Sequence, residues 1–143
     1  MGLKQIDFGS AEYELMVELR KQILRTPLGL SFSDEDLATE KNEILIASFD
    51  DEEILGCCVL SPCNNNKIRL RQMAVKDDIQ GKGIGASIIS FAESVAVDKG
   101  FEFIIMHARD TAIGFYEKFG YKVTGDVFYE VNLPHHLMEK KLI

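Results

Sequence analysis

Residues 67–86 read KIRLRQMAVKDDIQGKGIGA, and together with the residues that follow they predict one supersecondary unit. Residues 67–75 alternate apolar and polar side chains, which is typical of a half-buried strand. Three glycines follow at every second position, and residues 86–99 then carry apolar side chains at helical spacing. The apolar segment 101–108 predicts a second strand. Because strand–helix–strand connections are right-handed crossovers, the two strands are expected to be parallel.

The remaining segments are expected to surround this crossover with antiparallel strands and helices. Ser10 and Ser33 are expected to cap helices, and Asp36 completes a capping box with Ser33. The expected helices cover residues 11–24, a short segment from Ser33, and residues 112–119. The other expected strands cover residues 3–8, 44–49, 54–61, 121–129 and 134–142. The predicted fold class is therefore mixed α/β, with a central, mostly antiparallel sheet of about six to seven strands, one parallel βαβ crossover and flanking helices.

Length and charge limit the class of protein. The chain of 143 residues predicts a single domain over residues 1–143, because roughly 150 residues make one domain. A hydrophobic share of 46% excludes a disordered chain. The net charge of −7 argues against a nucleic-acid partner, since phosphate binding depends on clusters of Lys and Arg. A chain this acidic is better suited to a cationic substrate.

The sequence also predicts a cytoplasmic protein with no membrane partner and no metal. Its first residues lack the apolar core of a signal peptide. The longest run of apolar residues and glycine, residues 54–60, is far shorter than the roughly 20 residues that span a bilayer. Three cysteines, two of them adjacent at Cys57 and Cys58, give neither a disulfide framework nor a metal-binding spacing, and the histidines give none either.

The glycine loop is expected to lie where a helix begins, and a helix N-terminus with its unpaired N–H groups attracts anions. Glycines there allow a phosphate to lie directly on the backbone, and Lys82 adds a positive charge. A Walker P-loop is absent, because Lys82 is not followed by Ser or Thr. The pattern Gly81-x-Gly83-x-x-Ala86 formally meets the dinucleotide-binding fingerprint, although Asp110 follows Gly81 by about 30 positions where that fingerprint needs an acidic residue about 20 positions on.

A third pattern, Gln80-x-x-Gly83-x-Gly85, resembles the pyrophosphate loop of the GNAT family of acyl-CoA-dependent N-acyltransferases. Residues 71–75, RQMAV, resemble the family strand whose backbone binds the pantetheine arm. Residues 112–121, AIGFYEKFGY, resemble a helix that the family places after its central strand. The three motifs follow one another in the family's order and spacing.

A weaker resemblance lies near the end of the chain. Residues 128–138 carry Phe128-x-Glu130-x-x-Leu133-Pro134-His135-x-x-Met138, which is similar to the tail of a bacterial GNAT branch whose last strand carries Pro-His-x-x-Met.

The resemblance implies the GNAT fold, with acetyl-CoA as co-substrate. Arg109 stands where many family members have Asn, which is a departure from the family pattern at this position. Phe115 is expected to pack inward beside Tyr116. The residues that the resemblance implies for cofactor binding are Met73, Ala74, Val75, Gln80, Gly81, Lys82, Gly83, Ile84, Gly85, Ala86, Arg109, Phe115 and Tyr116.

Acetyl transfer to an amine needs a proton donor for the departing thiolate and a proton acceptor for the amine. By resemblance Tyr116 is the donor, and its structural alternative is a core aromatic on an amphipathic helix. Glu130 and His135 are the candidate acceptors, because both belong to the tail pattern. His135 and His136 are neighbours on an expected strand and therefore point to opposite faces, so no more than one of them can face the site.

Other polar residues have both a structural and a functional interpretation. His107, near the end of the central parallel strand, either contacts the substrate or is a hydrogen-bonded core residue. A group of acidic residues lies in the segment that lines the acceptor entrance in GNAT proteins, and it either attracts an amine or forms a solvated helix face. These residues are Asp34, Glu35, Asp36, Glu40 and Glu43.

The predicted function is an N-acetyltransferase that moves an acetyl group from acetyl-CoA to a primary amine of a small molecule or peptide by direct attack in a ternary complex. One alternative is a catalytically silent CoA-binding sensor or protein-interaction module. Another, based only on the Gly81-x-Gly83-x-x-Ala86 match, is a dinucleotide-binding protein. Exposed edge strands near the C-terminus would also allow a homodimer.

Overall fold

The structure is a computed structural model that describes residues 2–30 and 33–143, without the side chains of Asp34 and Glu35. The chain forms two compact units, and each unit takes two separate stretches of sequence. Unit 1 consists of Met1–Ser61 and Gln72–Ala92, and unit 2 consists of Pro62–Arg71 and Glu93–Ile143. The chain therefore passes from one unit to the other three times, once each within strand β3 (Glu53–Pro62), strand β4 (Lys67–Val75) and helix α3 (Ile84–Asp98).

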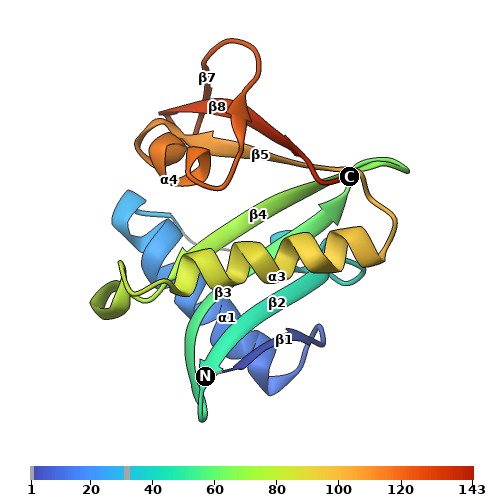
Figure 1. The fold of residues 1–143 in the computed structure, drawn as a ribbon. Coiled ribbons are helices and arrows are strands. Elements are labelled where there is room, and N and C mark those ends of the chain that lie inside the picture. The colour runs from blue at the N-terminus through green and yellow to red at the C-terminus, as the bar shows by residue number, and fades with distance from the viewer. Residues whose placement is uncertain (1, 31–32) are drawn as a thin grey trace. The chain divides into compact units, whose positions relative to one another are not determined.

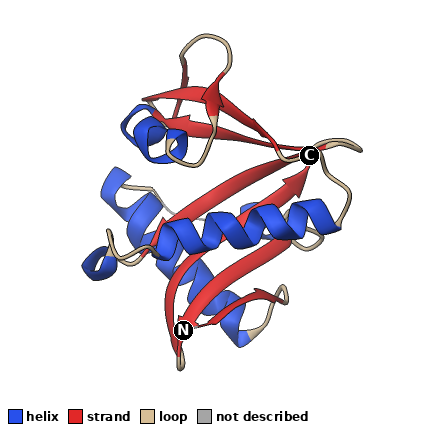
Figure 2. Cartoon of the chain, in the orientation of Figure 1, coloured by secondary structure: helices blue, strands red, loops and turns tan. Residues whose placement is uncertain are grey.

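Unit 1 contains the N-terminal strands of the sheet (Figures 1 and 2). Its strands are β1 (Gly2–Ile6), β2 (Ile44–Asp50), β3 (Glu53–Pro62) and the second half of β4, in the order β1-β2-β3-β4. β1 and β2 are antiparallel, as are β2 and β3. Asp51, with φ of 55°, forms the tight turn between β2 and β3, because Asp tolerates the left-handed region better than most residues do.

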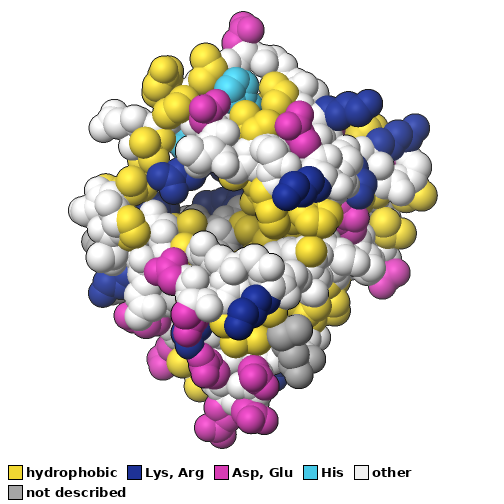
Figure 3. All heavy atoms as spheres, turned by 60° about the vertical axis from the view of Figure 1, so that its left-hand side comes forward, with side chains coloured by type: hydrophobic (Ala, Val, Ile, Leu, Met, Phe, Trp, Pro, Cys, Tyr) yellow, Lys and Arg dark blue, Asp and Glu magenta, His cyan; other side chains and the backbone are white. Residues whose placement is uncertain are grey.

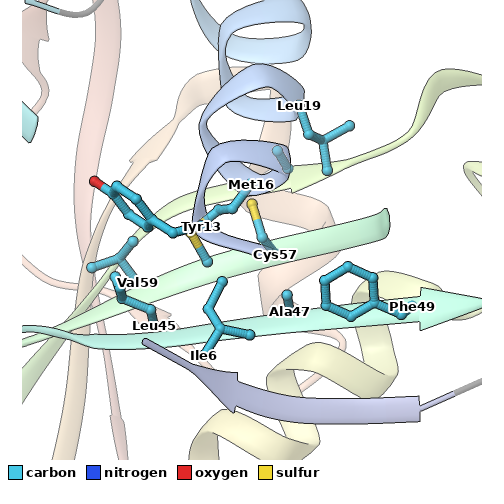
Figure 4. Packing of buried hydrophobic residues seen from close by; sticks show 10 residues of the cluster. Ile6, Tyr13, Met16, Leu19, Leu45, Ala47, Phe49, Cys57 and Val59 are labelled. Carbon is cyan, nitrogen blue, oxygen red and sulfur yellow. The ribbon is translucent and has the colours of Figure 1, made fainter. Parts of the chain in front are cut away.

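Helix α1 (Ala11–Arg20) covers one face of these strands. Ser10 caps it as predicted, with its side-chain oxygen accepting a hydrogen bond from the Tyr13 N–H at 3.1 Å. The inner side of the helix packs against alternate residues of the strands, as Figure 4 shows. The labelled members of this core are Ile6, Tyr13, Met16, Leu19, Leu45, Ala47, Phe49, Cys57 and Val59.

The α-helix ends four residues before the predicted limit of residue 24. A wider π-helical turn follows over Lys21–Arg25, and then a 3₁₀ turn over Thr26–Leu28. Pro27 has no N–H to donate and so cannot continue an α-helical ladder, which accounts for the change of winding before it. Helix α2 (Asp34–Ala38) starts with the predicted capping box, in which the Ser33 side chain accepts from the Asp36 N–H and the Asp36 carboxylate accepts from the Ser33 N–H.

A buried ion pair ties the end of α1 to the segment after α2. The Arg20 guanidinium donates from Nη1 and Nη2 to the two carboxylate oxygens of Glu40, at 2.8 and 2.6 Å. The Tyr13 hydroxyl donates to the same carboxylate at 2.7 Å, and its pKa is raised by burial and by the adjacent carboxylate. Glu40 is only 3% exposed, so it is neither part of an acidic entrance nor on a solvated helix face, and that expectation was wrong for this residue.

The first half of α3 covers the opposite face of the unit 1 strands, in front of them in Figure 1. The two approach closely at Gly56, where an added Cβ would lie 2.7 Å from the Ile88 Cδ1 and 3.1 Å from the Ala74 carbonyl oxygen. A side chain at position 56 would therefore push the Ile88 side chain aside and crowd the Ala74 carbonyl of β4. In unit 2, α3 ends as predicted at Gly100, which has φ of 89°, and the Phe101 N–H donates back to the Ala96 carbonyl at 3.0 Å.

Unit 2 contains a parallel pair of strands. The first residues of β4, from Lys67 to Leu70, pair in parallel with the start of β5 (Phe103–Arg109). β8 (Leu133–Lys141) runs antiparallel to the whole length of β5, and the strand order is β4-β5-β8-β6, with β7 also paired to β8. A mixed, mostly antiparallel sheet with one parallel crossover and flanking helices confirms the predicted fold class.

The predicted strand over residues 121–129 was wrong, because this segment forms two short strands. These are β6 (Lys122–Val123) and β7 (Phe128–Glu130), and each pairs with β8. Gly125, with φ of 85°, lies between them and turns the chain in a conformation that an extended strand does not contain.

The helical side of unit 2 is also shorter than predicted. A 3₁₀ turn over Asp110–Ala112 leads into α4 (Ile113–Glu117), and Gly120 with φ of 91° follows it.

A further 3₁₀ turn, Asp77–Ile79, precedes the glycine loop in unit 1. Within residues 2–30 and 33–143, no helix has both the length and the apolar character needed to cross a bilayer.

Candidate functional site

The glycine loop of unit 1 has an open backbone. Gly81 and Gly83 have φ of 88° and 84°, a left-handed conformation that residues with a Cβ rarely adopt. Apart from each glycine and its chain neighbours, no heavy atom of the described residues lies within 4 Å of the position where a Cβ would stand. The glycines are therefore required by the path of the chain and leave space above the loop, where a ligand can approach the backbone directly.

The N–H groups at the start of α3 face this space without helical partners. The first backbone bond of the helix is donated by Ser87 to the Gly83 carbonyl, at 3.0 Å. No described carbonyl of the loop accepts from the N–H groups of Ile84, Gly85 or Ala86, as expected for a first helical turn. Their partial positive charge, with the exposed Lys82 beside them, favours an anion at this end of a 15-residue helix.

Gln80 stabilises the turn that leads into the loop. Its side-chain Nε2 donates to the Val75 carbonyl at 3.0 Å and to the Asp77 carboxylate at 3.3 Å. The side chain thus links the end of β4 to the 3₁₀ turn, and it sets the loop conformation through these two bonds.

The second half of β4 carries Met73, Ala74 and Val75, of which Ala74 is buried and the other two are half-buried. The residue before them, Gln72, has φ of 53°, so the regular alternation predicted through this position is wrong. A non-glycine residue in this region costs of order 1–3 kcal/mol and interrupts the strand locally. The Gln72 carbonyl accepts a hydrogen bond from the Cys57 thiol at 3.7 Å, which helps to hold this conformation.

In unit 2, α4 places Tyr116 against the sheet. Tyr116 is buried, and its ring lies 6.1 Å from that of Tyr121, whose hydroxyl donates to Glu93 at 2.9 Å. Phe115 is 37% exposed, so the expectation that it packs inward was wrong. Successive residues of a helix point about 100° apart, so Phe115 cannot face the same way as the buried Tyr116. The Phe115 ring instead contacts those of Tyr116 and Phe119 from outside.

A cluster of two histidines, a glutamate and a phenylalanine lies on the other face of the unit 2 sheet. The Nδ1 atom of His107 lies 2.5 Å from Oε1 of Glu130. The Nε2 atom of His135 lies 4.0 Å from Oε2 of the same carboxylate, and its Nδ1 donates to the Leu133 carbonyl at 2.9 Å. The Phe128 ring contacts both imidazoles, at centroid distances of 5.1 and 5.9 Å. The structure therefore brings Glu130 and His135 together and adds His107 to them.

The remaining candidates lie near this cluster. Arg109 ends β5 and pairs in register with His135, so both side chains leave the sheet on the same face. His136 points to the opposite face, as strand alternation predicts, and its Nδ1 lies 3.8 Å from the Asp110 carboxylate. Among the described residues, no three His, Cys, Asp or Glu side chains are grouped as a metal site requires.

Sequence reasoning named His107 but missed its pairing with Glu130. The two residues are brought together because β7 and β8 form a hairpin whose turn residues, Val131 and Asn132, have φ of 46° and 62°. Asn132 is a typical turn residue, and the spacing of this turn was the one local signal that could have given the register.

Solved structures share this fold over nearly the whole chain. An aminoglycoside 6'-N-acetyltransferase complexed with coenzyme A has a TM-score of 0.84 and 19% identity, covering 100% of this chain and 98% of that one. A GNAT family acetyltransferase from Elizabethkingia anophelis with acetyl-CoA bound has a TM-score of 0.74 and 18% identity, covering 98% and 97%. At these identities the likeness shows the fold.

Sequence relatives point to the same family. The Xenopus tropicalis protein named "Probable N-acetyltransferase 14" is 33% identical over 89 residues, which are 59% of this chain and 43% of that protein. A relative from Bacillus subtilis (strain 168) is matched over 50% of its length, so the chain spans about half the length of these curated relatives. The family profile described as the acetyltransferase (GNAT) domain matches residues 26–142, a range that includes residues of both units. The chain therefore belongs to the GNAT family of acetyltransferases.

Proposed function

We propose that this protein transfers an acetyl group from acetyl-CoA to a primary amine of a small molecule or peptide, by direct attack in a ternary complex. The observation that supports this most directly is the glycine loop. Its left-handed Gly81 and Gly83 leave the backbone uncovered where α3 begins, and the first N–H groups of that helix have no helical acceptor. This arrangement suits a pyrophosphate, which needs several N–H donors and positive charge close together.

The donor side of the reaction is assigned to residues of unit 1. Gly81, Lys82, Gly83 and the first turn of α3, Ile84 to Ala86, would hold the pyrophosphate, with Gln80 fixing the loop. The backbone of Met73, Ala74 and Val75 would hold the pantetheine arm by analogy with the family strand. Acetyl-CoA supplies a thioester, whose carbonyl carbon accepts an amine and whose sulfur leaves as a thiolate.

Tyr116 of unit 2 is proposed as the proton donor to the departing sulfur. When the amine nitrogen bonds to the acetyl carbon, the carbon–sulfur bond breaks and its electron pair stays with the sulfur. The Tyr116 hydroxyl then gives its proton to the sulfur and recovers one from solvent. A buried, well-packed phenol suits this task because its ring is fixed by Tyr121.

The acceptor side is assigned to the face of the unit 2 sheet that carries Glu130 and His135. One of the groups of this cluster would take the proton that the amine loses. The Pro134-His135-x-x-Met138 tail suggests the corresponding bacterial branch of the family, and the net charge of −7 favours a cationic acceptor. Cys57 and Cys58 are buried thiols and form no disulfide, which fits a reducing compartment such as the cytoplasm.

Thermal unfolding with acetyl-CoA, CoA, NAD or ATP present tests the donor assignment. A ligand at about 100 times its dissociation constant adds roughly 2.7 kcal/mol to the free energy of unfolding, which corresponds to a rise of several degrees in Tm. We expect a rise with acetyl-CoA and CoA and none with NAD. A rise with NAD alone would favour the dinucleotide-binding alternative instead.

An amine panel tests turnover, with free thiol release measured for kanamycin, spermine, lysine and a lysine-containing peptide. Acetylation of at least one amine is expected, and Tyr116→Phe should lower kcat by about 10-fold or more while leaving the acetyl-CoA thermal shift in place. Tyr129→Phe is the control, because Tyr129 is 70% exposed and should not affect the rate. Binding of CoA without acetylation of any amine would favour the silent sensor.

A further inference from the structure

We propose that His107 is the proton acceptor of this reaction and that Glu130 positions its ring. This inference rests on the proposed acetyltransferase function and identifies the base that function leaves open. It differs from the sequence expectation, in which Glu130 or His135 is the base.

The short contact with Glu130 determines which nitrogen of His107 is free to react. An ionised carboxylate can only accept a hydrogen bond, so at 2.5 Å from Oε1 the Nδ1 atom of His107 carries the hydrogen. A neutral imidazole has one N–H, and the lone pair is therefore on Nε2. No described residue donates a hydrogen bond to that Nε2. His107 thus presents a basic nitrogen whose orientation is set by a carboxylate.

The imidazole of His135, unlike that of His107, is buried. Its Nδ1 donates to the Leu133 carbonyl at 2.9 Å, and its side chain is only 7% exposed. The side chain of His107 is 27% exposed. An amine substrate can therefore reach the imidazole of His107 but not that of His135. The His135 Nε2 lies 4.0 Å from Oε2 of Glu130, which is beyond hydrogen-bond distance, so the Leu133 carbonyl and not this carboxylate holds His135.

Phe128 fixes the orientation of both rings. It meets the His107 ring edge to face, with an interplanar angle of 79°, and stacks on the His135 ring at 28°. With one nitrogen hydrogen-bonded and one side against a phenyl ring, the His107 imidazole has little freedom to rotate away. A base held in this way loses little entropy when it takes a proton from a bound amine.

The position of His107 in β5 also makes it accessible. Along this strand Ile104, Met106 and Ala108 are buried, whereas the alternate residues, including His107, are only half-buried. Around β7 and β8 the surface shows histidine side chains beside acidic and hydrophobic ones, in the upper part of Figure 3. The cluster is therefore on a face of unit 2 that a substrate can approach.

Charged groups of all five strands of unit 2 share this face with His107. By register they are Lys67 and Arg69 of β4, Arg109 of β5, Lys122 of β6, Glu130 of β7, and His135, Glu139 and Lys141 of β8. Of these, Glu130 contacts the imidazole directly. When the amine nitrogen bonds to the acetyl carbon, it gives one proton to Nε2, and the resulting imidazolium is balanced by the Glu130 carboxylate. His107 then releases that proton to solvent.

Kinetics of variants test this assignment with any amine of the panel that the wild-type protein acetylates. His107→Ala should lower kcat by about 100-fold or more while the acetyl-CoA thermal shift is kept, and added imidazole should restore part of the rate. Glu130→Gln should lower kcat less than His107→Ala does. His136→Gln is the matched control, since its imidazole lies near Asp110 on the opposite face, and its rate should be unchanged.

The outcomes separate this inference from the proposed function. Unchanged kcat in His107→Ala, in a protein that acetylates an amine, would overturn the inference and leave the proposed function standing. A His107→Ala protein that is inactive, is not rescued by imidazole and has lost its acetyl-CoA shift would show a structural role and would also overturn it. No acetylation by the wild-type protein would overturn both. Nitrogen-15 NMR of the wild-type chain gives a test without activity: we expect the Nδ1–H form of His107, and the Nε2–H form would refute the assignment.

Discussion

Gly83 combines two properties that different measurements can separate. Its φ of 84° disfavours any residue with a Cβ, and its backbone belongs to the proposed pyrophosphate loop. Gly9 has nearly the same φ, 78°, with the same open surroundings, but lies in the turn before α1.

We therefore expect Gly83→Ala and Gly9→Ala to lower the free energy of unfolding by a similar amount, about 1–2 kcal/mol, because each forces alanine into the left-handed region. Only Gly83→Ala should weaken CoA binding, since only there does the added methyl group or a shift of the loop disturb the N–H donors. Urea unfolding and calorimetric titration with CoA measure the two effects. Equal CoA affinity in both variants would count against the loop as the phosphate site.

The buried thiols should make the folded protein less stable as the pH rises into the alkaline range. Burial raises the pKa of Cys57 to about 12, and burial together with Cys57 also raises the pKa of Cys58, from an ordinary value of 9.0. The folded chain thus keeps these protons at a pH where the unfolded chain loses them. Their contribution to stability is complete below pH 9 and is lost as the pH rises from 9 towards about 12.

Urea unfolding should give a lower free energy of unfolding at about pH 10.5 than at pH 8. The difference between the two pH values should be smaller in a Cys57→Ala, Cys58→Ala double variant. The comparison is between the two slopes with pH, because the double variant is also destabilised by the cavities it creates. Tyr13, whose pKa is raised as well, remains in both proteins and does not affect the difference. Identical slopes would mean that the thiols do not titrate in this range.

At the scale of elements, the Arg20–Glu40 pair is the polar contact that joins α1 to the segment after α2. Both groups are almost fully buried, and the Glu40 carboxylate accepts three hydrogen bonds from Arg20 and Tyr13. We expect Glu40→Gln to lower the free energy of unfolding by roughly 3–5 kcal/mol, because it leaves the Arg20 charge without a counterion in the interior. Glu12→Gln removes an exposed ion pair with Lys4 and should cost less than about 1 kcal/mol. Denaturant unfolding of both variants makes the comparison, and similar losses would contradict it.

The elements that local signals define were predicted well. β4 occupies the predicted residues, Lys67–Val75, and α3 ends before Gly100 as expected, because alternation and a left-handed glycine are properties of short stretches. Contacts between distant segments were predicted poorly. Nothing in the local sequence shows that Gln72 takes a positive φ, since that conformation depends on packing against β3 through Cys57.

In the candidate site, too, the part defined by local sequence was predicted and the part that depends on contacts between distant segments was not. The loop from Gln80 to Ala86 is continuous in sequence, so its glycine pattern was sufficient to find it. The cluster around His107 depends on the register of β5, β7 and β8, and a shift of one residue would turn Glu130 to the opposite face. Residues 23 positions apart therefore meet for a reason that the local pattern does not contain.

At the scale of the whole molecule, the net charge of −7 should affect the encounter with substrate. A negative protein attracts cationic amines over distances that salt screens, with a Debye length of about 10 Å at 0.1 M ionic strength. Among the amines that are acetylated, we expect kcat/KM to fall with added KCl more steeply for those that carry more positive charges. Potassium sulfate at matched ionic strength is the control for specific ion effects. An equal fall for singly and multiply charged amines would show that the overall charge does not steer binding.

The interleaving of the two units has a consequence for biosynthesis. Unit 1 takes its last residues from the stretch that ends at Ala92, so the ribosome must make about two thirds of the chain before that unit can be complete. β3 ends at Pro62, roughly 30 residues earlier, which corresponds to about 2–6 s of translation at usual rates. During these seconds the apolar strands β2 and β3 are outside the ribosome without the half of α3 that later covers them. The nascent chain is therefore the form of this protein that most needs a chaperone.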